Sequence, residues 1–145
     1  MKGWLLWVFA LGMCFSHAQE RSNVLVLTDV GGDTDDQQSL VRLLLYSDVL
    51  NITGIVATST MGHGLKTYPN IVQEAISRYE QVYPALRFYE PSYPEPGFLY
   101  SMVKSGLPDY QSVGRGWESE GANHMKSLGR LIHRFTWLSG VGTAS

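Results

Sequence analysis

An aspartate-rich turn between two strongly apolar segments is the feature that most limits how this chain can fold. A continuous apolar run rich in β-branched residues, Asn23 to Thr28, ends directly in Asp29 and the glycine pair Gly31-Gly32. Runs of this kind are typical of a buried parallel strand that ends in a loop. The segment from about Asp35 to Ser47 has the broad apolar face of a helix, and Ile52 to Thr60 is a second β-branched run. Strand, helix and strand within about forty residues predict a βαβ unit.

The rest of the chain continues the α/β pattern. Apolar residues at helical spacing, with a proline in the first turn, predict a helix from about Pro69 to Tyr83. A turn-rich segment, Glu90 to Gly97, precedes a short helix expected near Phe98 to Lys104, and a last helix is expected to start near Ser119. We therefore predict an α/β fold with an open, mostly parallel sheet and flanking helices, similar to a Rossmann fold. Ligands of such sheets bind outside the carboxyl ends of the strands.

Four aspartates lie within eight residues of the turn: Asp29, Asp33, Asp35 and Asp36. Like charges packed together cost energy unless a cation or a set of N–H donors offsets them. We expect the turn to bring all four around a single point, with Gly31-Gly32 bending the backbone through positive φ. Carboxylate oxygens from a strand end and a helix start suit Ca²⁺ or Mg²⁺. The competing interpretation is an aspartate-rich turn that only caps the following helix.

Spacing and charge exclude other kinds of site. An EF-hand loop would continue Asp33-x-Asp35 with another Asp or Asn and then a glycine, whereas this chain has Gln37 and Gln38. A phosphate-binding loop would need GxGxxG or GK[ST], and four carboxylates would repel a phosphate. The 11 Lys and Arg against 13 Asp and Glu give a net charge of −2, which offers no electrostatic reason to expect a nucleic-acid or anionic-membrane partner.

The first 18 residues predict a secretory signal peptide. Lys2 precedes an apolar stretch from Trp4 to Phe15, and Ser16 and Ala18 are small residues at the −3 and −1 positions of a cleavage site. Cleavage after Ala18 would leave 145 − 18 = 127 residues without a cysteine, because Cys14 lies in the signal. We expect a secreted or periplasmic protein with no membrane segment after signal cleavage. The alternative is an uncleaved N-terminal anchor.

The run VLVLTDVGGDTDDQQSLVRLLLYS resembles the amino-terminal motif of the nucleoside hydrolase superfamily, Asp-x-Asp-Pro-Gly-x-Asp-Asp. It is most similar to a secreted branch with a nucleoside hydrolase-like domain, some of whose members are described as cellulose-binding. The resemblance implies that Asp29 and Asp36 hold a Ca²⁺, that Asp29 is also the base that deprotonates a bound water, and that Asp35 contacts ribose hydroxyls. Leu27 and Val30 depart from the motif, because they stand where it has its first Asp and its Pro.

A weaker resemblance over more of the chain adds candidates for the substrate site. Gly62-His63 stands where the family has Gly-Asn, which places His63 near a sugar hydroxyl; a solvent-facing loop histidine is the other interpretation. Glu118 and Glu120, in the sequence WESEGAN, could border the same pocket or could be solvated residues ahead of a helix that Ser119 caps. The aromatic residues between Tyr83 and Trp117 could stack on sugar rings, although packing is the favoured interpretation.

The resemblance implies a hydrolase that cleaves the N-glycosidic bond of a nucleoside, or another glycosyl bond, with a Ca²⁺-activated water. The alternative is an exported, non-catalytic carbohydrate-binding protein, for instance for cellulose, on the same scaffold; a third is a structural α/β fragment. The family takes its remaining metal ligands, a Thr carbonyl and a distal Asp, from a later half of the fold, and here no acidic residue follows Glu120. We therefore expect residues 19–126 to be the amino-terminal part of a nucleoside hydrolase-like domain, residues 127–145 a divergent tail from truncation or a frameshift, and the chain alone to be catalytically incompetent.

Overall fold

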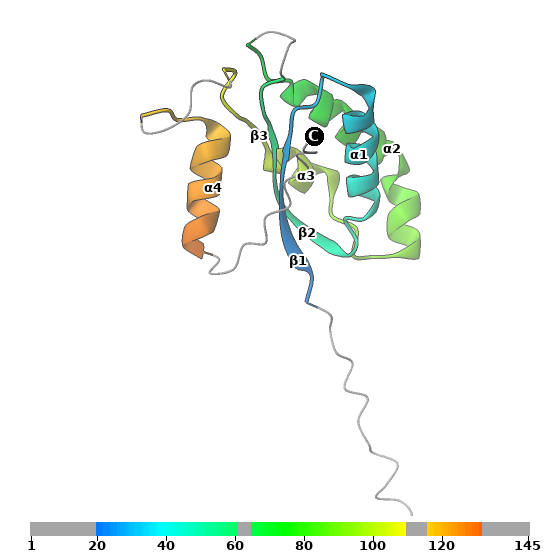
Figure 1. Ribbon diagram of the computed structural model, residues 1–145. Coiled ribbons are helices and arrows are strands. Elements are labelled where there is room, and N and C mark those ends of the chain that lie inside the picture. The colour runs from blue at the N-terminus through cyan, green and yellow to red at the C-terminus, as the bar shows by residue number, and fades with distance from the viewer. Residues whose placement is uncertain (1–19, 61–64, 110–115, 132–145) are drawn as a thin grey trace, which may run out of the picture.

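The computed structural model describes residues 20–60, 65–109 and 116–131, which Figure 1 shows in colour. The predicted signal peptide, His63 and most of the predicted tail lie outside these residues. Among the described helices, none combines the length and the apolar character that crossing a membrane requires. The elements in chain order are β1 (Ser22–Thr28), α1 (Thr34–Leu45), β2 (Leu50–Ala57), α2 (Pro69–Tyr89), α3 (Pro96–Met102), β3 (Val103–Ser105) and α4 (Glu120–Leu131).

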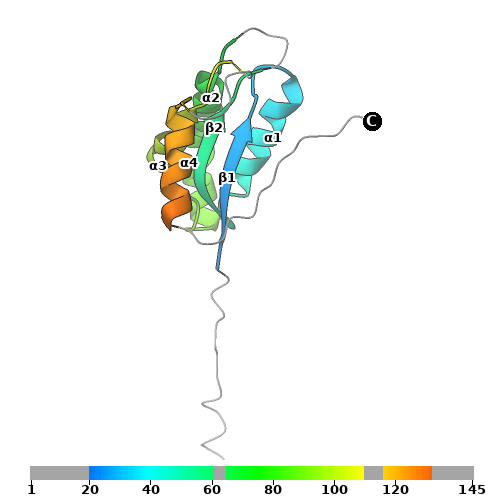
Figure 2. The same cartoon turned by 60° about the vertical axis from the view of Figure 1, so that its left-hand side comes forward.

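The strands form one parallel sheet in the order β1-β2-β3. Helices α1, α2 and α3 lie on one side of this sheet and α4 lies on the other, as two views of the molecule show (Figure 1, Figure 2). The predicted βαβ unit is therefore confirmed, because β1 and β2 pair in parallel with α1 between them in the chain. The predicted fold class, an open parallel α/β sheet with flanking helices, is confirmed as well.

A register shift decides which residues of β2 face the main core. The pairing of β1 with β2 shifts between Val24 and Leu25, so that Thr53 is an extra residue on β2. The Thr53 hydroxyl donates a hydrogen bond to the Val24 carbonyl oxygen at 3.1 Å. Because of this bulge, Ile52 and Ile55 lie three positions apart and still belong to the same buried cluster.

Two glycines allow α4 to approach the other face of the sheet closely. A Cβ at Gly54 of β2 would lie 2.9 Å from the ring of His124, and a Cβ at Gly121 of α4 would overlap the side chain of Val56. The Nε2 atom of His124 lies 2.6 Å from the Thr53 carbonyl oxygen. The helix is therefore hydrogen-bonded to the bulge itself.

The main core lies between the sheet and α1, α2 and α3. Buried residues at a spacing of three or four turn one face of α1 and of α2 toward the sheet, and α3 contributes Leu99. The largest buried apolar side chains come from every layer: Val30, Leu40, Leu44, Ile52, Ile55, Val72, Ile76, Tyr79 and Leu99. At about 25 cal/mol per Å² of apolar surface, their burial is the main stabilisation of this side of the sheet.

The structure corrects the predicted ends of β2 and α2. β2 ends at Ala57 rather than Thr60, because the chain leaves the sheet and Ser59 forms an isolated antiparallel bridge with Thr67. α2 continues beyond Tyr83 and contains Pro84. Pro84 lies on the exposed side of the helix, where water can bond the carbonyl that the missing proline N–H leaves free.

The segment near residues 96–105 also differs from the prediction. α3 begins at Pro96 and ends at Met102, about two residues earlier than its apolar pattern indicates. The three residues of β3 follow it directly and pair with the last three of β2, from Ile55 to Ala57. Such a short segment contains no readable alternation, so tertiary pairing rather than local sequence makes it a strand.

Candidate functional site

The acidic turn lies where β1 ends, at the carboxyl edge of the sheet. Gly31 has a φ of +107°, and a Cβ at this position would lie 2.7 Å from Tyr68 Cδ2, so backbone conformation and space both require glycine. Val30 is fully buried, whereas Asp29 is exposed. The Gly32 N–H donates to the Asp29 carbonyl oxygen at 3.4 Å and closes the turn. The predicted positive φ is confirmed at Gly31 and is wrong for Gly32, whose backbone stays outside the left-handed region.

Four aspartate charges surround this turn. Asp29 follows β1, Asp33 is the N-cap residue of α1, and Asp35 and Asp36 lie in the first helical turn. Partial burial raises the pKa of Asp36, and the charges of Asp29, Asp35 and Asp33 raise it further. The Asp33 side chain makes no capping hydrogen bond, so the geometry gives no support to the interpretation of the turn as a simple helix cap.

The aspartates do not form a ready-made metal centre. In the part of the chain that the structure describes, no three His, Cys, Asp or Glu side chains gather closely enough to hold an ion. The expectation that all four carboxylates meet at one point is therefore not met, and mutual repulsion of the carboxylates opposes such a cluster. A Ca²⁺ at Asp29 and Asp36 stays a prediction, as does the contact of Asp35 with a sugar.

A buried hydroxyl lies beside this turn, after the end of β2. Thr60 is 2% exposed, and its Oγ1 has no hydrogen-bond partner among the residues that the structure describes. Its methyl carbon would lie 3.9 Å from a Cβ at Gly32, which places Thr60 against the acidic turn. A buried hydroxyl without a partner costs about 1–3 kcal/mol, so such a group needs an explanation. Thr60 was not predicted as a site residue, because a threonine at the end of a β-branched run is typical of a strand.

The structure separates the two glutamates of the sequence WESEGAN. Glu120 Oε2 accepts a hydrogen bond of 3.4 Å from the Ser105 backbone N–H, at the carboxyl end of β3. The hydroxyl oxygens of Ser105 and Thr67 lie 2.7 Å apart at the same place. Glu118 instead forms a surface ion pair with Lys126 at 3.2 Å. Glu120 thus lies at the same edge of the sheet as the acidic turn, with β2 between them. The Glu118 carboxylate instead pairs with Lys126 at the surface.

Two further sequence predictions concern this edge of the sheet. The Ser119 hydroxyl accepts a hydrogen bond of 3.1 Å from the Ala122 N–H, so Ser119 is the N-cap of α4 as predicted. His63 lies in residues 61–64, outside the described residues, and its contact with a sugar hydroxyl stays a prediction.

Packing explains some of the aromatic residues after the start of α2, and others are exposed. Tyr79 is buried, and its ring centroid lies 5.8 Å from that of Tyr83 and 6.4 Å from that of Tyr93. Burial raises the pKa of Tyr79 to about 12, so its hydroxyl stays neutral. Phe88 and Tyr89 are different, because each is 83% exposed. The preference for packing over sugar stacking therefore holds for the three buried or half-buried tyrosines and not for this pair.

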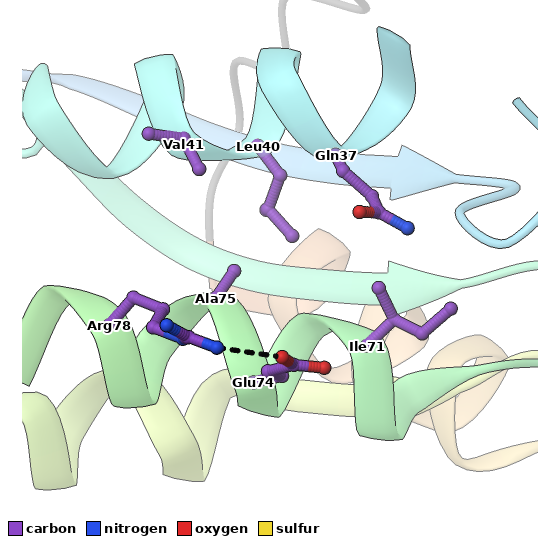
Figure 3. Close-up of a pocket in the computed structure, with 7 residues that line it drawn as sticks. All are labelled: Gln37, Leu40, Val41, Ile71, Glu74, Ala75 and Arg78. Atoms are coloured by element: carbon purple, nitrogen blue, oxygen red, sulfur yellow. Dashed lines mark hydrogen bonds and ion pairs between the residues drawn. The ribbon is translucent and has the colours of Figure 1, made fainter. Parts of the chain in front are cut away.

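A groove of about 210 Å³ lies between α1 and α2, on the flank of the sheet rather than at the strand ends (Figure 3). Leu40 and Ala75 give it an aliphatic floor, and the ion pair between Glu74 and Arg78, at 3.4 Å, lies along its rim. The predicted site residues do not line this groove. The candidate site therefore consists of the acidic turn and the neighbouring strand ends.

Comparisons with known proteins agree with this fold. The family model described as "Cellulose-binding Sde182, nucleoside hydrolase-like domain" matches residues 23–139, a span that reaches beyond Lys126. A solved structure of a nucleoside hydrolase-related hypothetical protein from Saccharophagus degradans, described as associated with carbohydrate metabolism, is similar with a TM-score of 0.70 and 32% sequence identity. The similarity covers 75% of this chain and 27% of that chain. A search of curated proteins finds no match.

Proposed function

The chain belongs to the family of cellulose-binding Sde182 proteins with a nucleoside hydrolase-like domain, and on that premise we propose that its acidic turn is part of a calcium-dependent site for a glycosyl group. The proposal depends above all on the four aspartates around Gly31, where burial and neighbouring charges raise the pKa of Asp36. A divalent cation between Asp29 and Asp36 would remove this repulsion.

The oxygen atoms around the turn fit a hard cation and a polyol. Asp29 and Asp36 supply carboxylates from a strand end and from a helix start. Thr60, whose methyl group lies against Gly32, adds a buried hydroxyl that has no partner among the described residues. Ca²⁺ takes about six to eight oxygen ligands, so sugar hydroxyls and water would complete such a site. The hydroxyls of Ser105 and Thr67 at the end of β3 offer further hydrogen bonds to a sugar.

A hydrolytic reaction assigns a separate task to each acidic residue. Calcium, when bound, supplies positive charge that makes a water ligand more acidic. Asp29, at the end of β1, accepts the proton of the attacking water as general base. Asp35 accepts a hydrogen bond from a ribose hydroxyl, and the acidic surroundings stabilise the positive charge that develops on the anomeric carbon. The water oxygen bonds to the anomeric carbon as the N-glycosidic bond of a nucleoside, or another glycosyl bond, breaks. The leaving group takes its proton from solvent water.

A second candidate function is carbohydrate binding without catalysis. Leu27 stands where the nucleoside hydrolase motif has its first Asp, and it is 45% exposed at the end of β1. The described residues also bring no three possible metal ligands together. The chain spans 27% of the solved relative, so the complete activity of such a protein includes residues beyond this similarity. In both functions the ligand is a nucleoside or a carbohydrate, and the cellulose-binding description of the family supports an exported protein.

Calorimetry with the full chain tests the cation site. We expect the wild-type protein to bind Ca²⁺ at one site and the Asp36→Asn variant to bind none. The matched control is Glu74→Gln, which neutralises an exposed carboxylate on α2 and should leave Ca²⁺ binding unchanged. Wild-type protein that takes up no Ca²⁺ would refute the proposal.

An activity assay separates the two candidate functions. Ca²⁺-dependent release of ribose from nucleosides, lost in Asp29→Asn, would establish hydrolysis. Retention on cellulose or oligosaccharide, with no ribose release and no change in Asp36→Asn, would establish non-catalytic binding instead.

A further inference from the structure

A second cleft lies at the opposite end of the sheet, where the strands begin. It has a volume of about 260 Å³ and is lined by Arg21 ahead of β1, by Asp48 and Val49 ahead of β2, and by Glu90 and Ser92 after α2. These residues come from three separate segments, which meet only because the amino ends of β1 and β2 are neighbours. The cleft shares no residue with the acidic turn.

Hydrogen bonds hold the polar groups of this cleft in place. Arg21 Nη1 donates to the Ser92 carbonyl oxygen at 3.2 Å, and the Ser92 N–H donates to Glu90 Oε1 at 3.1 Å. The Ser92 hydroxyl donates to the Asp48 carbonyl oxygen at 3.3 Å. Hydrogen bonds from Ser92, together with the charge of Arg21, hold the pKa of Glu90 below its usual range. A guanidinium donor and an ionised carboxylate acceptor are thus fixed side by side, as neighbouring sugar hydroxyls require.

Two aromatic side chains lie immediately before Glu90 in the chain. Phe88 and Tyr89 end α2, are each 83% exposed, and touch one another edge to face, with ring centroids 5.4 Å apart and ring planes at 86°. Residues so exposed contribute nothing to the core, so their large apolar faces are free for a ligand. Because the rings are perpendicular, one can stack on a sugar ring while the other forms a side wall.

The chemistry of the cleft favours a neutral saccharide over other ligands. One cation, Arg21, lies with two carboxylates, Asp48 and Glu90, so the lining repels phosphate groups and other anionic ligands. Neutral hydroxyl groups of a ligand can still form hydrogen bonds with the polar groups of the cleft. The exposed aromatic faces fit the C–H face of a pyranose ring. Neutral glucans combine these two properties.

We propose that the cleft of Arg21, Asp48 and Glu90 is a calcium-independent binding site for a neutral β-glucan chain, and that the exposed pair Phe88 and Tyr89, which directly precedes Glu90 in the chain, extends this site beyond the cleft lining. It deepens the carbohydrate-binding function proposed above and places this binding at the end of the sheet away from the acidic turn. The two ends then have different tasks, because the acidic turn takes a cation and a glycosyl group while the aromatic end holds a polysaccharide.

A calorimetric titration of the full chain with cellohexaose tests this site. We expect binding that is unchanged by EDTA and by Asp36→Asn, and that weakens about tenfold, or 1.4 kcal/mol, in Tyr89→Ala and in Glu90→Gln. The matched control is Trp117→Ala, which removes an aromatic side chain that is 53% exposed near the start of α4. Circular dichroism of each variant verifies that these exposed changes leave the fold intact.

The outcomes distinguish this site from the calcium site. Cellohexaose binding that survives Tyr89→Ala and Glu90→Gln but is lost in Asp36→Asn would overturn the inference and leave carbohydrate binding at the acidic turn. Wild-type protein that binds Ca²⁺ but not cellohexaose would also overturn the inference, and would leave the proposed cation site standing.

Discussion

Replacing Gly31 by alanine tests the account of how the acidic turn is built. The backbone at Gly31 has a φ of +107°, which L-residues rarely adopt, and the new Cβ would lie 2.7 Å from Tyr68 Cδ2 and 3.3 Å from Ile71 Cδ1. A residue held in a sparsely populated backbone region costs about 1–3 kcal/mol. Forcing a side chain into occupied space costs a further amount of about 1–3 kcal/mol. Gly31→Ala should therefore lower the free energy of unfolding by about 2–6 kcal/mol.

Two other glycines separate the backbone cost from the cost of overlap. Gly116 also has a positive φ, +94°, but a Cβ there would meet no atom of the described residues within 4 Å, so Gly116→Ala should cost about 1–3 kcal/mol. Gly97 lies within α3 without a positive φ and also with open space, so Gly97→Ala should be neutral or stabilise the fold by about 0.5–1 kcal/mol.

Urea unfolding followed by circular dichroism gives all three values. We expect the order of stability Gly97→Ala, then Gly116→Ala, then Gly31→Ala. If Gly31→Ala unfolds at the same urea concentration as Gly97→Ala, neither the strained backbone nor the contact with Tyr68 shapes the turn, and the reasoning is wrong.

Three further predictions concern the charge at the turn, the attachment of α4 and the edge of the sheet. Because the folded-state pKa of Asp36 is raised, its charged form destabilises the metal-free fold, and this destabilisation disappears as the pH falls through that pKa. Asp36→Asn should therefore raise the urea midpoint in EDTA near neutral pH but not in acid. An equal rise of the midpoint in acid would contradict charge repulsion and burial as the cause. His124→Ala leaves the Thr53 carbonyl without its partner at 2.6 Å and should cost about 1–2 kcal/mol, with faster amide hydrogen exchange in α4 than in α2; unchanged exchange would show that the contact does not hold the helix. Leu27→Lys places a charge on an exposed position of a strand at the end of the described sheet, and it should lower any self-association through this edge that sedimentation analysis detects in the wild type, whereas equal association of both proteins would exclude this edge as its cause.

The sequence was sufficient for the elements whose pattern is local. The apolar run predicts β1, and the helical spacing of Leu40 and Leu44 predicts α1. The observed ends of both elements differ from the predicted ends by about two residues or fewer. Gly31 was also readable, because a glycine between a strand and a helix commonly takes a positive φ. Ser119 could also be predicted as an N-cap, because a serine just before a helix commonly accepts a hydrogen bond from a backbone N–H of the first turn.

Features that depend on tertiary contacts were not readable. β3 is a strand only because Val103 to Ser105 meets β2, and the bulge at Thr53 depends on pairing with β1. The unpaired hydroxyl of Thr60 and the contact of Glu120 with Ser105 appear only when separate strand ends come together. The arrangement of the four aspartates was predicted too simply, because spacing along the chain places charges near each other but does not decide where carboxylates point.

The most direct measurement of the central claim is a Ca²⁺ titration of the ¹⁵N-labelled full chain, followed by the chemical shift of each backbone amide. If the acidic turn binds the cation, the amides of Gly31, Gly32 and Asp36 shift together and saturate, those of the Glu90 cleft stay in place, and Asp36→Asn abolishes the change. Shifts that are absent from the acidic turn at saturating Ca²⁺, or that are largest around Asp48 and Glu90, would contradict the account.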